Sequence, residues 1–192
     1  SSYRSNPLGL AEFTLSRKDP KYVARAKAIQ KAETERMAGG HPCEAVPAVK
    51  DIMHTVKEKY PDANHENTGF GSTIFAVKPG DGSAREQAAS CQKVLGGWAN
   101  IANEYATKRY RSNLINWGML PFLIEKGELP FKNLDYLFIP GIKKAVEEKA
   151  DTITAYKVGG DGMTPFTMTL GELTDEERQI ILKGCLINYN RV

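Results

Sequence analysis

A short apolar run, a glycine-rich turn and a helical stretch follow one another between residues 73 and 97, and this succession constrains the fold most. Thr73–Val77 is an unbroken run of apolar and β-branched residues, which predicts a buried strand. Gly80-Asp81-Gly82 then predicts a turn, and Ser83 opens a helical stretch that ends at Gly96-Gly97. Because a helix N-terminus favours negative charge, the sequence predicts an anion-handling site near Ser83.

The residue types at this helix start suit an anionic ligand, although a structural role for the serine stays open. Ser83 lies three residues before Glu86, which is also the spacing of a capping box. Gly80 and Gly82 allow the backbone to approach a ligand, and Arg85 adds a guanidinium that can form two parallel hydrogen bonds. A serine hydroxyl is a weak base near neutral pH, so it acts as one only where the local potential is positive.

Two familiar motifs are absent at this turn. The GxSxG turn of α/β-hydrolases and the GxGxxG phosphate-binding loop both need glycine where Arg85 stands. No lysine follows in the pattern of a nucleotide-binding P-loop. The sequence therefore favours neither a hydrolase nor a nucleotide-binding protein.

Length and composition predict one domain. The chain has 192 residues, of which 41% are hydrophobic and 26% charged, so it can form a substantial core, and two independent domains are not expected. We expect residues 1–192 to form a single domain in which residues 1–70 are an N-terminal loop and helical extension. There is no apolar run of about 18 residues and no signal-peptide pattern, so we expect a cytoplasmic protein with no membrane span. Because residue 1 is serine, we expect a piece of a longer chain.

The order of expected elements defines a mixed α/β fold with helices layered around a small sheet. Expected helices cover residues 20–38, 47–60, 105–117 and 140–150, and a last helix begins at the capping box of Thr174 with Ile181, Leu182, Cys185, Leu186 and Tyr189 inward. Expected strands cover residues 98–102, 152–158 and 165–170, the last two joined by a glycine-rich hairpin turn at residues 159–162. Residues 61–71 and 120–133 are expected to be loops.

Histidine, cysteine and basic residues do not define a further site. His41, Cys43, His54 and His65 match no familiar zinc spacing, and the three cysteines, Cys43, Cys91 and Cys185, lie far apart without a CxxC pair, so we expect no metal in this chain and reduced thiols. The cluster Lys108–Arg111 contains a tyrosine, but the net charge is only +3, and we do not expect nucleic-acid binding. Trp98 and Trp117 are expected in the core or a groove.

At Gly82-Ser83-Ala84-Arg85-Glu86-Gln87-Ala88-Ala89, followed by Leu95-Gly96-Gly97, the chain resembles the C-terminal swivelling domain of the aconitase family of hydro-lyases. Downstream, Asn113-Leu114 and Gly118-Met119-Leu120-Pro121 resemble the asparagine and glycine-leucine-proline segment of that family. The resemblance is best over residues 70–122. It implies a swivelling β/β/α fold that closes over a four-iron, four-sulfur cluster, whose cysteine ligands belong to domains of the same polypeptide outside this chain.

The resemblance also implies roles for single residues. Ser83 matches the general base that takes the substrate C–H proton, and Arg85 matches an arginine that binds a substrate carboxylate. Arg4 occupies roughly the place of a second carboxylate-binding arginine, and Gly82 and Ala84 border the substrate. The implied reaction is the reversible dehydration of a hydroxy-polycarboxylate, such as a tricarboxylate, with the cluster iron as Lewis acid. The domain alone is expected to be inactive.

Three departures from the family pattern bear on the substrate. Ala84 stands where close relatives of aconitase carry a second serine, Gln87 where histidine is usual, and Trp98 where arginine is usual. Citrate and isocitrate are therefore not assumed as substrates. Two alternatives stay open: the small subunit of an isopropylmalate- or homoaconitate-type isomerase, and a non-catalytic module that binds an anion or phosphate.

Overall fold

The computed structural model describes residues 20–39, 48–63, 68–80, 92–93, 97–132, 135–159 and 162–183. Within these ranges the chain forms two three-stranded sheets. The first is parallel, in the order β1-β2-β3, and comprises β1 (Ser72–Ala76), β2 (Gly97–Ala102) and β3 (Leu120–Leu123). The second is antiparallel, in the order β4-β5-β6, and comprises β4 (Tyr136–Phe138), β5 (Ile153–Gly159) and β6 (Gly162–Met168).

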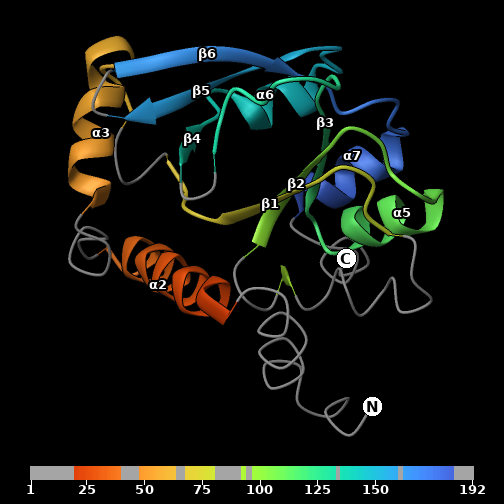
Figure 1. Cartoon of the computed structure of the whole chain (residues 1–192), viewed down its shortest axis with the longest axis horizontal. Helices are drawn as coiled ribbons and strands as arrows, with labels where there is room; N and C mark the ends of the chain where they lie inside the picture. The colour runs from red at the N-terminus through yellow and green to blue at the C-terminus, as the bar shows by residue number, and fades with distance from the viewer. Residues whose placement is uncertain are drawn as a thin grey trace, which may run out of the picture.

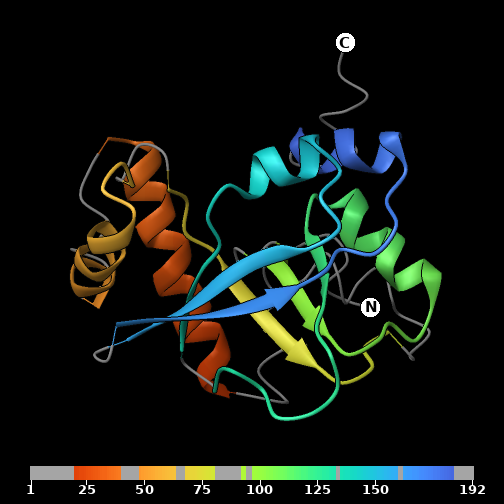
Figure 2. The same cartoon turned by 90° about the horizontal axis from the view of Figure 1, so that it is seen from above.

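The antiparallel sheet lies over the parallel one, as Figures 1 and 2 show. An isolated antiparallel bridge joins the two sheets, in which Leu123 and Thr169 exchange backbone hydrogen bonds of 2.6 and 2.9 Å. The main core draws side chains from both sheets, among them Ile101 of β2, Phe122 of β3 and Ala155 of β5. Burial of this shared apolar surface is the chief force that holds the two sheets together.

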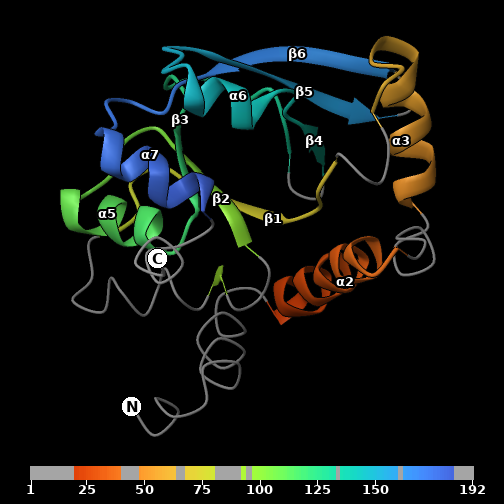
Figure 3. The same cartoon turned by 180° about the vertical axis from the view of Figure 1, so that it is seen from behind.

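Five helices surround the sheets in the described ranges: α2 (Pro20–Met37), α3 (Ala48–Lys59), α5 (Lys108–Asn116), α6 (Ile142–Glu147) and α7 (Asp175–Leu182). Figure 3 shows α5 and α7 side by side at one end of the molecule, and α2 and α3 at the other. None of the helices in the described ranges is long and apolar enough to cross a membrane.

Helix α3 packs on the antiparallel sheet through a second, smaller core. Met53 and Val56 are buried against Tyr156 and Val158 of β5. The hydroxyl groups of Tyr60 and Tyr156 lie 2.9 Å apart and share a hydrogen bond. Because apolar residues recur on one face of α3 and charged residues cover the other, this packing follows from its sequence periodicity.

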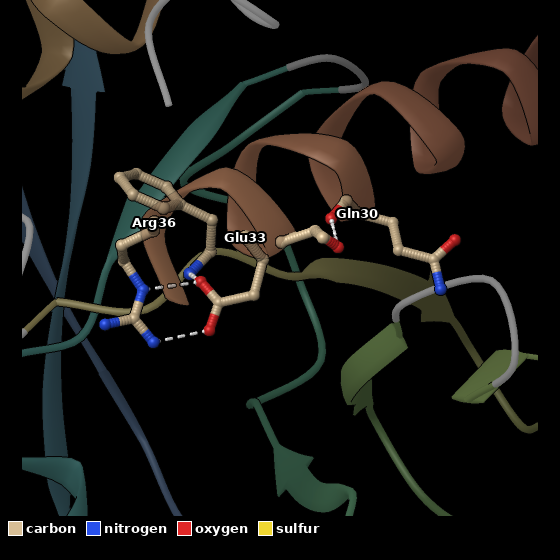
Figure 4. Close-up of polar contacts among 5 residues, drawn as sticks. Gln30, Glu33 and Arg36 are labelled. Carbon is tan, nitrogen blue, oxygen red and sulfur yellow. Dashed lines mark hydrogen bonds and ion pairs between the residues drawn. The ribbon is translucent and has the colours of Figure 1, made fainter. Parts of the chain in front are cut away.

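Helix α2 is fixed to the chain just before β1 by a partly buried carboxylate, that of Glu33 (Figure 4). Glu33 accepts a hydrogen bond from the backbone N–H of Phe70 at 2.8 Å. The same carboxylate accepts two hydrogen bonds from Arg36, from Nε at 2.8 Å and from a terminal nitrogen at 2.6 Å. The hydrogen bond to Glu33 raises the pKa of Arg36, so the guanidinium stays positively charged.

The structure confirms most of the expected elements in the ranges that it describes. The predicted mixed α/β class is confirmed, although parallel and antiparallel pairing are divided between two sheets. Helix α7 begins at the predicted capping box, in which the Thr174 hydroxyl accepts from the N–H of Glu177 at 3.1 Å and the Glu177 carboxylate accepts from the N–H of Thr174 at 3.0 Å.

Three expectations need correction. Residues 120–123 form β3 where a loop was expected; Pro121 is tolerated because it pairs with β2 alone, while the other side of β3 is bridged to Thr169 at Leu123. Strand β4 was not expected, and β1 is half-buried at a sheet edge where a buried strand was predicted. Ile181 and Leu182 pack against the core as predicted, and Ile180 of α7 is buried as well. Cys185, Leu186 and Tyr189 lie outside the described residues.

Candidate functional site at the carboxyl edge of the parallel sheet

The five residues that sequence reasoning assigned to a site, Ser83, Arg85, Gly82, Ala84 and Arg4, lie outside the described residues. The chain is described on both sides of residues 81–91, up to Gly80 and again from Gln92. The structure therefore gives the surroundings in which this segment begins and ends. It neither brings the five residues together nor separates them.

The segment begins at the carboxyl edge of the parallel sheet. Strand β1 ends at Ala76, and the following residues pair with the loop after β2: the N–H of Glu104 donates to the carbonyl oxygen of Val77 at 3.2 Å, and that of Ala106 to Pro79 at 2.9 Å. In open parallel sheets the carboxyl edge is the usual place for ligands. The predicted anion-handling turn therefore follows a sheet edge at which ligands usually bind, and it stays a prediction because residues 81–91 lie outside the described residues.

Gly80 packs directly against Tyr110, a buried tyrosine of α5. Its φ is +97°, and a Cβ atom at this position would lie 2.5 Å from Cβ and 2.6 Å from Cγ of Tyr110. Tyr110 is only 2% exposed, so the ring has no room to retreat. Both the backbone conformation and the contact therefore require glycine at position 80.

Gln92, Asn100 and Tyr110 form a closed ring of three hydrogen bonds, referred to below as the hydrogen-bond ring. Nε2 of Gln92 donates to the Tyr110 hydroxyl at 3.0 Å, that hydroxyl donates to Oδ1 of Asn100 at 2.9 Å, and Nδ2 of Asn100 donates to Oε1 of Gln92 at 2.5 Å. Gln92 is 6% and Asn100 2% exposed. Every side-chain oxygen and nitrogen of the three residues takes part, so each of these buried polar atoms has a hydrogen-bond partner.

A second tyrosine holds the neighbouring backbone. The Tyr105 hydroxyl lies 2.9 Å from the carbonyl oxygen of Phe122 in β3 and 3.3 Å from that of Asn100 in β2. Burial raises the pKa of Tyr105 far above its ordinary value, with a smaller contribution from Tyr110. The group stays a neutral hydrogen-bond donor, and we assign it no role as a base.

The basic cluster at the start of α5 does not form a continuous charged surface. Tyr110 is buried, and Arg111 donates to the carbonyl oxygens of Leu170 at 3.2 Å and Glu172 at 2.6 Å. Lys108 and Arg109 alone are exposed. Arg111 therefore joins α5 to the loop before α7, and the aromatic residue of the cluster is not available for stacking on a base.

The described residues do not fit an iron–sulfur cluster. They contain no cysteine, since Cys43, Cys91 and Cys185 lie outside them. In these ranges no three side chains of histidine, cysteine, aspartate or glutamate gather where a metal ion could be held. Iron–sulfur clusters need several thiolate ligands, so the described residues by themselves do not hold one.

The other motif residues have packing roles where they are described. Trp98 lies over the backbone of Gly69 and Gly71, where an added Cβ would come within 2.1 and 2.3 Å of its ring. Gly118 ends α5 with a φ of +75°, and Met119 is fully buried beneath Tyr110 and Leu114. Gln87 lies outside the described residues.

Sequence reasoning missed Gln92, Asn100 and Tyr110. The available signal was a glutamine near the end of an expected helix, an asparagine inside an apolar strand and a tyrosine inside a basic cluster. Each is polar at a position whose neighbours predict burial, and buried polar groups need partners.

Comparison with known proteins agrees with the resemblance noted in the sequence. The chain matches the aconitase C-terminal domain family over residues 26–127, more than half of its length, a stretch that includes residues 81–91 and the hydrogen-bond ring. This chain belongs to the aconitase C-terminal domain family.

Two individual proteins illustrate the likeness. Aconitate hydratase A of Rickettsia bellii (strain RML369-C) is 25% identical over 146 residues, which are 73% of this chain and 16% of that protein. The chain thus spans about a sixth of the length of this curated relative. The crystal structure of 3-isopropylmalate dehydratase (leuD) of Methanocaldococcus jannaschii has 24% sequence identity and a TM-score of 0.40, covering 65% of this chain and 66% of that one.

Proposed function

We propose that this chain supplies the catalytic base and a carboxylate-binding arginine to an aconitase-type hydro-lyase that reversibly dehydrates a hydroxy-polycarboxylate. The observation that carries the proposal is the family match over residues 26–127, because it includes the serine–arginine segment. The described residues support it, since the segment follows β1 at the carboxyl edge of a parallel sheet, where ligands usually bind.

In this proposal Ser83 takes the proton from the substrate carbon adjacent to the one that carries the departing hydroxyl. Arg85 binds a substrate carboxylate through two N–H groups and adds the positive potential that a serine base requires. Arg4 binds a second carboxylate, and Gly82 and Ala84 border the substrate. The iron–sulfur cluster, with ligands outside this chain, supplies the Lewis acid for the hydroxyl when it is bound.

Ala84 guides the choice of substrate. A serine at this position would offer a hydroxyl to the substrate, and alanine offers only a methyl group. A site built to hydrogen-bond a substrate group discriminates strongly, and the loss of one donor changes which substrate fits. We therefore propose a substrate other than citrate or isocitrate and would test a panel of hydroxy-dicarboxylates and hydroxy-tricarboxylates.

The test of Ser83 uses the full protein that contains this chain, with its cluster assembled. Ser83→Ala should lower kcat by about 10²- to 10⁴-fold, the usual contribution of a general base, with KM little changed. Ser112→Ala, on the exposed face of α5, is the matched control and should leave kcat unaltered. Near-normal turnover in Ser83→Ala would refute the assignment.

Arg85→Lys tests the carboxylate contact in the same assay. A lysine keeps the charge but loses the two-pronged geometry, so KM should rise by roughly tenfold or more. Arg109→Lys, at an exposed position of α5, is the control. Tight binding of phosphate or tricarboxylates without turnover on any substrate of the panel would instead favour a non-catalytic anion-binding module. Turnover of isopropylmalate or homoaconitate alone would favour the two-chain isomerase.

A further inference from the structure

We propose that Tyr110 is a positioning residue that holds the chain on both sides of residues 81–91, at Gly80 through its ring and at Gln92 through its hydroxyl. The consequence for turnover rests on the proposed function, because that function places the base and the carboxylate-binding arginine between these two points. The effect on the backbone at Gly80 and Gln92 does not depend on that function.

The two attachments come from one buried side chain. Gly80 lies so close to the ring that no side chain fits between them, with a hypothetical Cβ only 2.5 Å from Cβ of Tyr110. Gln92 donates to the hydroxyl at the other end of the same ring, at 3.0 Å. Gly97 adds a further close approach, since its hypothetical Cβ would lie 2.7 Å from the carbonyl oxygen of Gln92. The positions of residues 80 and 92 are thus set by the same rigid group.

The hydrogen-bond ring makes this attachment sensitive to a single atom. The Tyr110 hydroxyl takes part in two of the three bonds, to Gln92 and to Asn100. Both partners are at least nine-tenths buried, so water does not replace the lost oxygen without a rearrangement. Removal of the hydroxyl leaves Gln92 bonded through Oε1 alone and frees its side chain to turn.

Tyr105 provides a matched control within the same core cluster. Its ring centre lies 6.2 Å from that of Tyr110, and its hydroxyl donates to backbone carbonyls of β2 and β3. Loss of that hydroxyl weakens the sheet but removes no bond to Gln92. Tyr105→Phe and Tyr110→Phe therefore delete the same group from the same cluster with different effects on the segment.

The experiment compares wild type, Tyr105→Phe and Tyr110→Phe in the full protein by hydrogen–deuterium exchange. Tyr110→Phe should speed amide exchange about tenfold or more in peptides that contain Gln92–Gly97, relative to peptides from β5 and β6, and should change peptides with Gly80 less, because phenylalanine keeps the ring that Gly80 contacts. Tyr105→Phe should leave this ratio near the wild-type value. The same exchange ratio in both variants would overturn the proposal.

A double-mutant cycle separates positioning from general loss of stability. Gln92→Leu should raise exchange at the same peptides, and the effect of the Gln92→Leu/Tyr110→Phe double variant should be smaller than the sum of the two single effects, because both single variants remove the bond between Gln92 and Tyr110. Additive effects at these peptides would overturn the proposal.

Activity then gives the functional readout. kcat/KM should fall roughly tenfold or more in Tyr110→Phe and stay near wild type in Tyr105→Phe, since small displacements of catalytic groups are costly. If Ser83→Ala retains turnover, the proposed function fails while the exchange result stands. If Ser83→Ala is inactive and Tyr110→Phe shows normal kcat/KM, the positioning role in turnover fails alone.

Discussion

Substitution of Gly80 by alanine tests the contact on which the candidate segment depends. The residue has a φ of +97°, which costs a residue with a side chain about 1–3 kcal/mol. The new methyl group would also meet Tyr110 at 2.5 Å, and overpacking in a closely packed interior costs typically about 1–3 kcal/mol. Together the two effects predict that the free energy of unfolding falls by about 2–6 kcal/mol.

Gly127→Ala is the matched control for this experiment. Gly127 has a φ of +135°, and a Cβ there would meet nothing within 4 Å, so only the backbone cost applies. Urea unfolding of wild type and both variants, followed by circular dichroism, gives the three free energies. If Gly80→Ala lowers the free energy of unfolding no more than Gly127→Ala does, the contact between Gly80 and Tyr110 is not tight. The inference that the Tyr110 ring holds the chain at Gly80 would then be wrong.

Two further predictions concern α7. Thr174→Ala removes the hydroxyl of the capping box and should lower the free energy of unfolding by about 1 kcal/mol, whereas Thr174→Ser should leave it nearly unchanged; equal melting temperatures for the alanine and serine variants would contradict this. The hydrogen bond from Lys149 lowers the pKa of Asp175, so the stabilisation is present above the ordinary carboxyl pKa and is lost as the pH falls through the lowered one. The difference in melting temperature between wild type and Asp175→Asn should therefore shrink between about pH 5 and about pH 3, and a difference that stays constant over this range would refute the ion pair.

The elements with strong local signals could be predicted from the sequence. Strands β1 and β2 were predicted within one residue of their ends, because each is a compact apolar run bounded by glycine. The start of α7 was predicted from one threonine and one glutamate, since a capping box is a local structure.

Strand β3 could not be predicted because its stability comes from partners far away in the sequence. Pro121 and the glycine nearby indicate a loop, yet Leu120–Leu123 pairs with β2 and Phe122 is fully buried. Burial of Phe122 between two sheets outweighs the missing hydrogen bond of one proline at an edge position. The same holds for the division into two sheets, which no local pattern specifies.

The candidate site was predictable only in its outline. Strand β1 could be recognised from its apolar run, and the predicted turn and helix start after Gly80 lie outside the described residues. The hydrogen-bond ring joins residues 92, 100 and 110, which are far apart in the sequence. Its clearest trace in the sequence is that Asn100 interrupts an otherwise apolar strand. A polar residue in such a position predicts a partner but does not identify it.

The central claim is that Ser83 takes a proton from carbon, and isotope exchange measures that step most directly. In D₂O the full protein, supplied with the substrate found in the panel, should incorporate deuterium at the reacting carbon as it reverses the dehydration. The account predicts that Ser83→Ala lowers this incorporation by about 10²- to 10⁴-fold, in parallel with kcat. Incorporation at the wild-type rate in Ser83→Ala would mean that another group is the base.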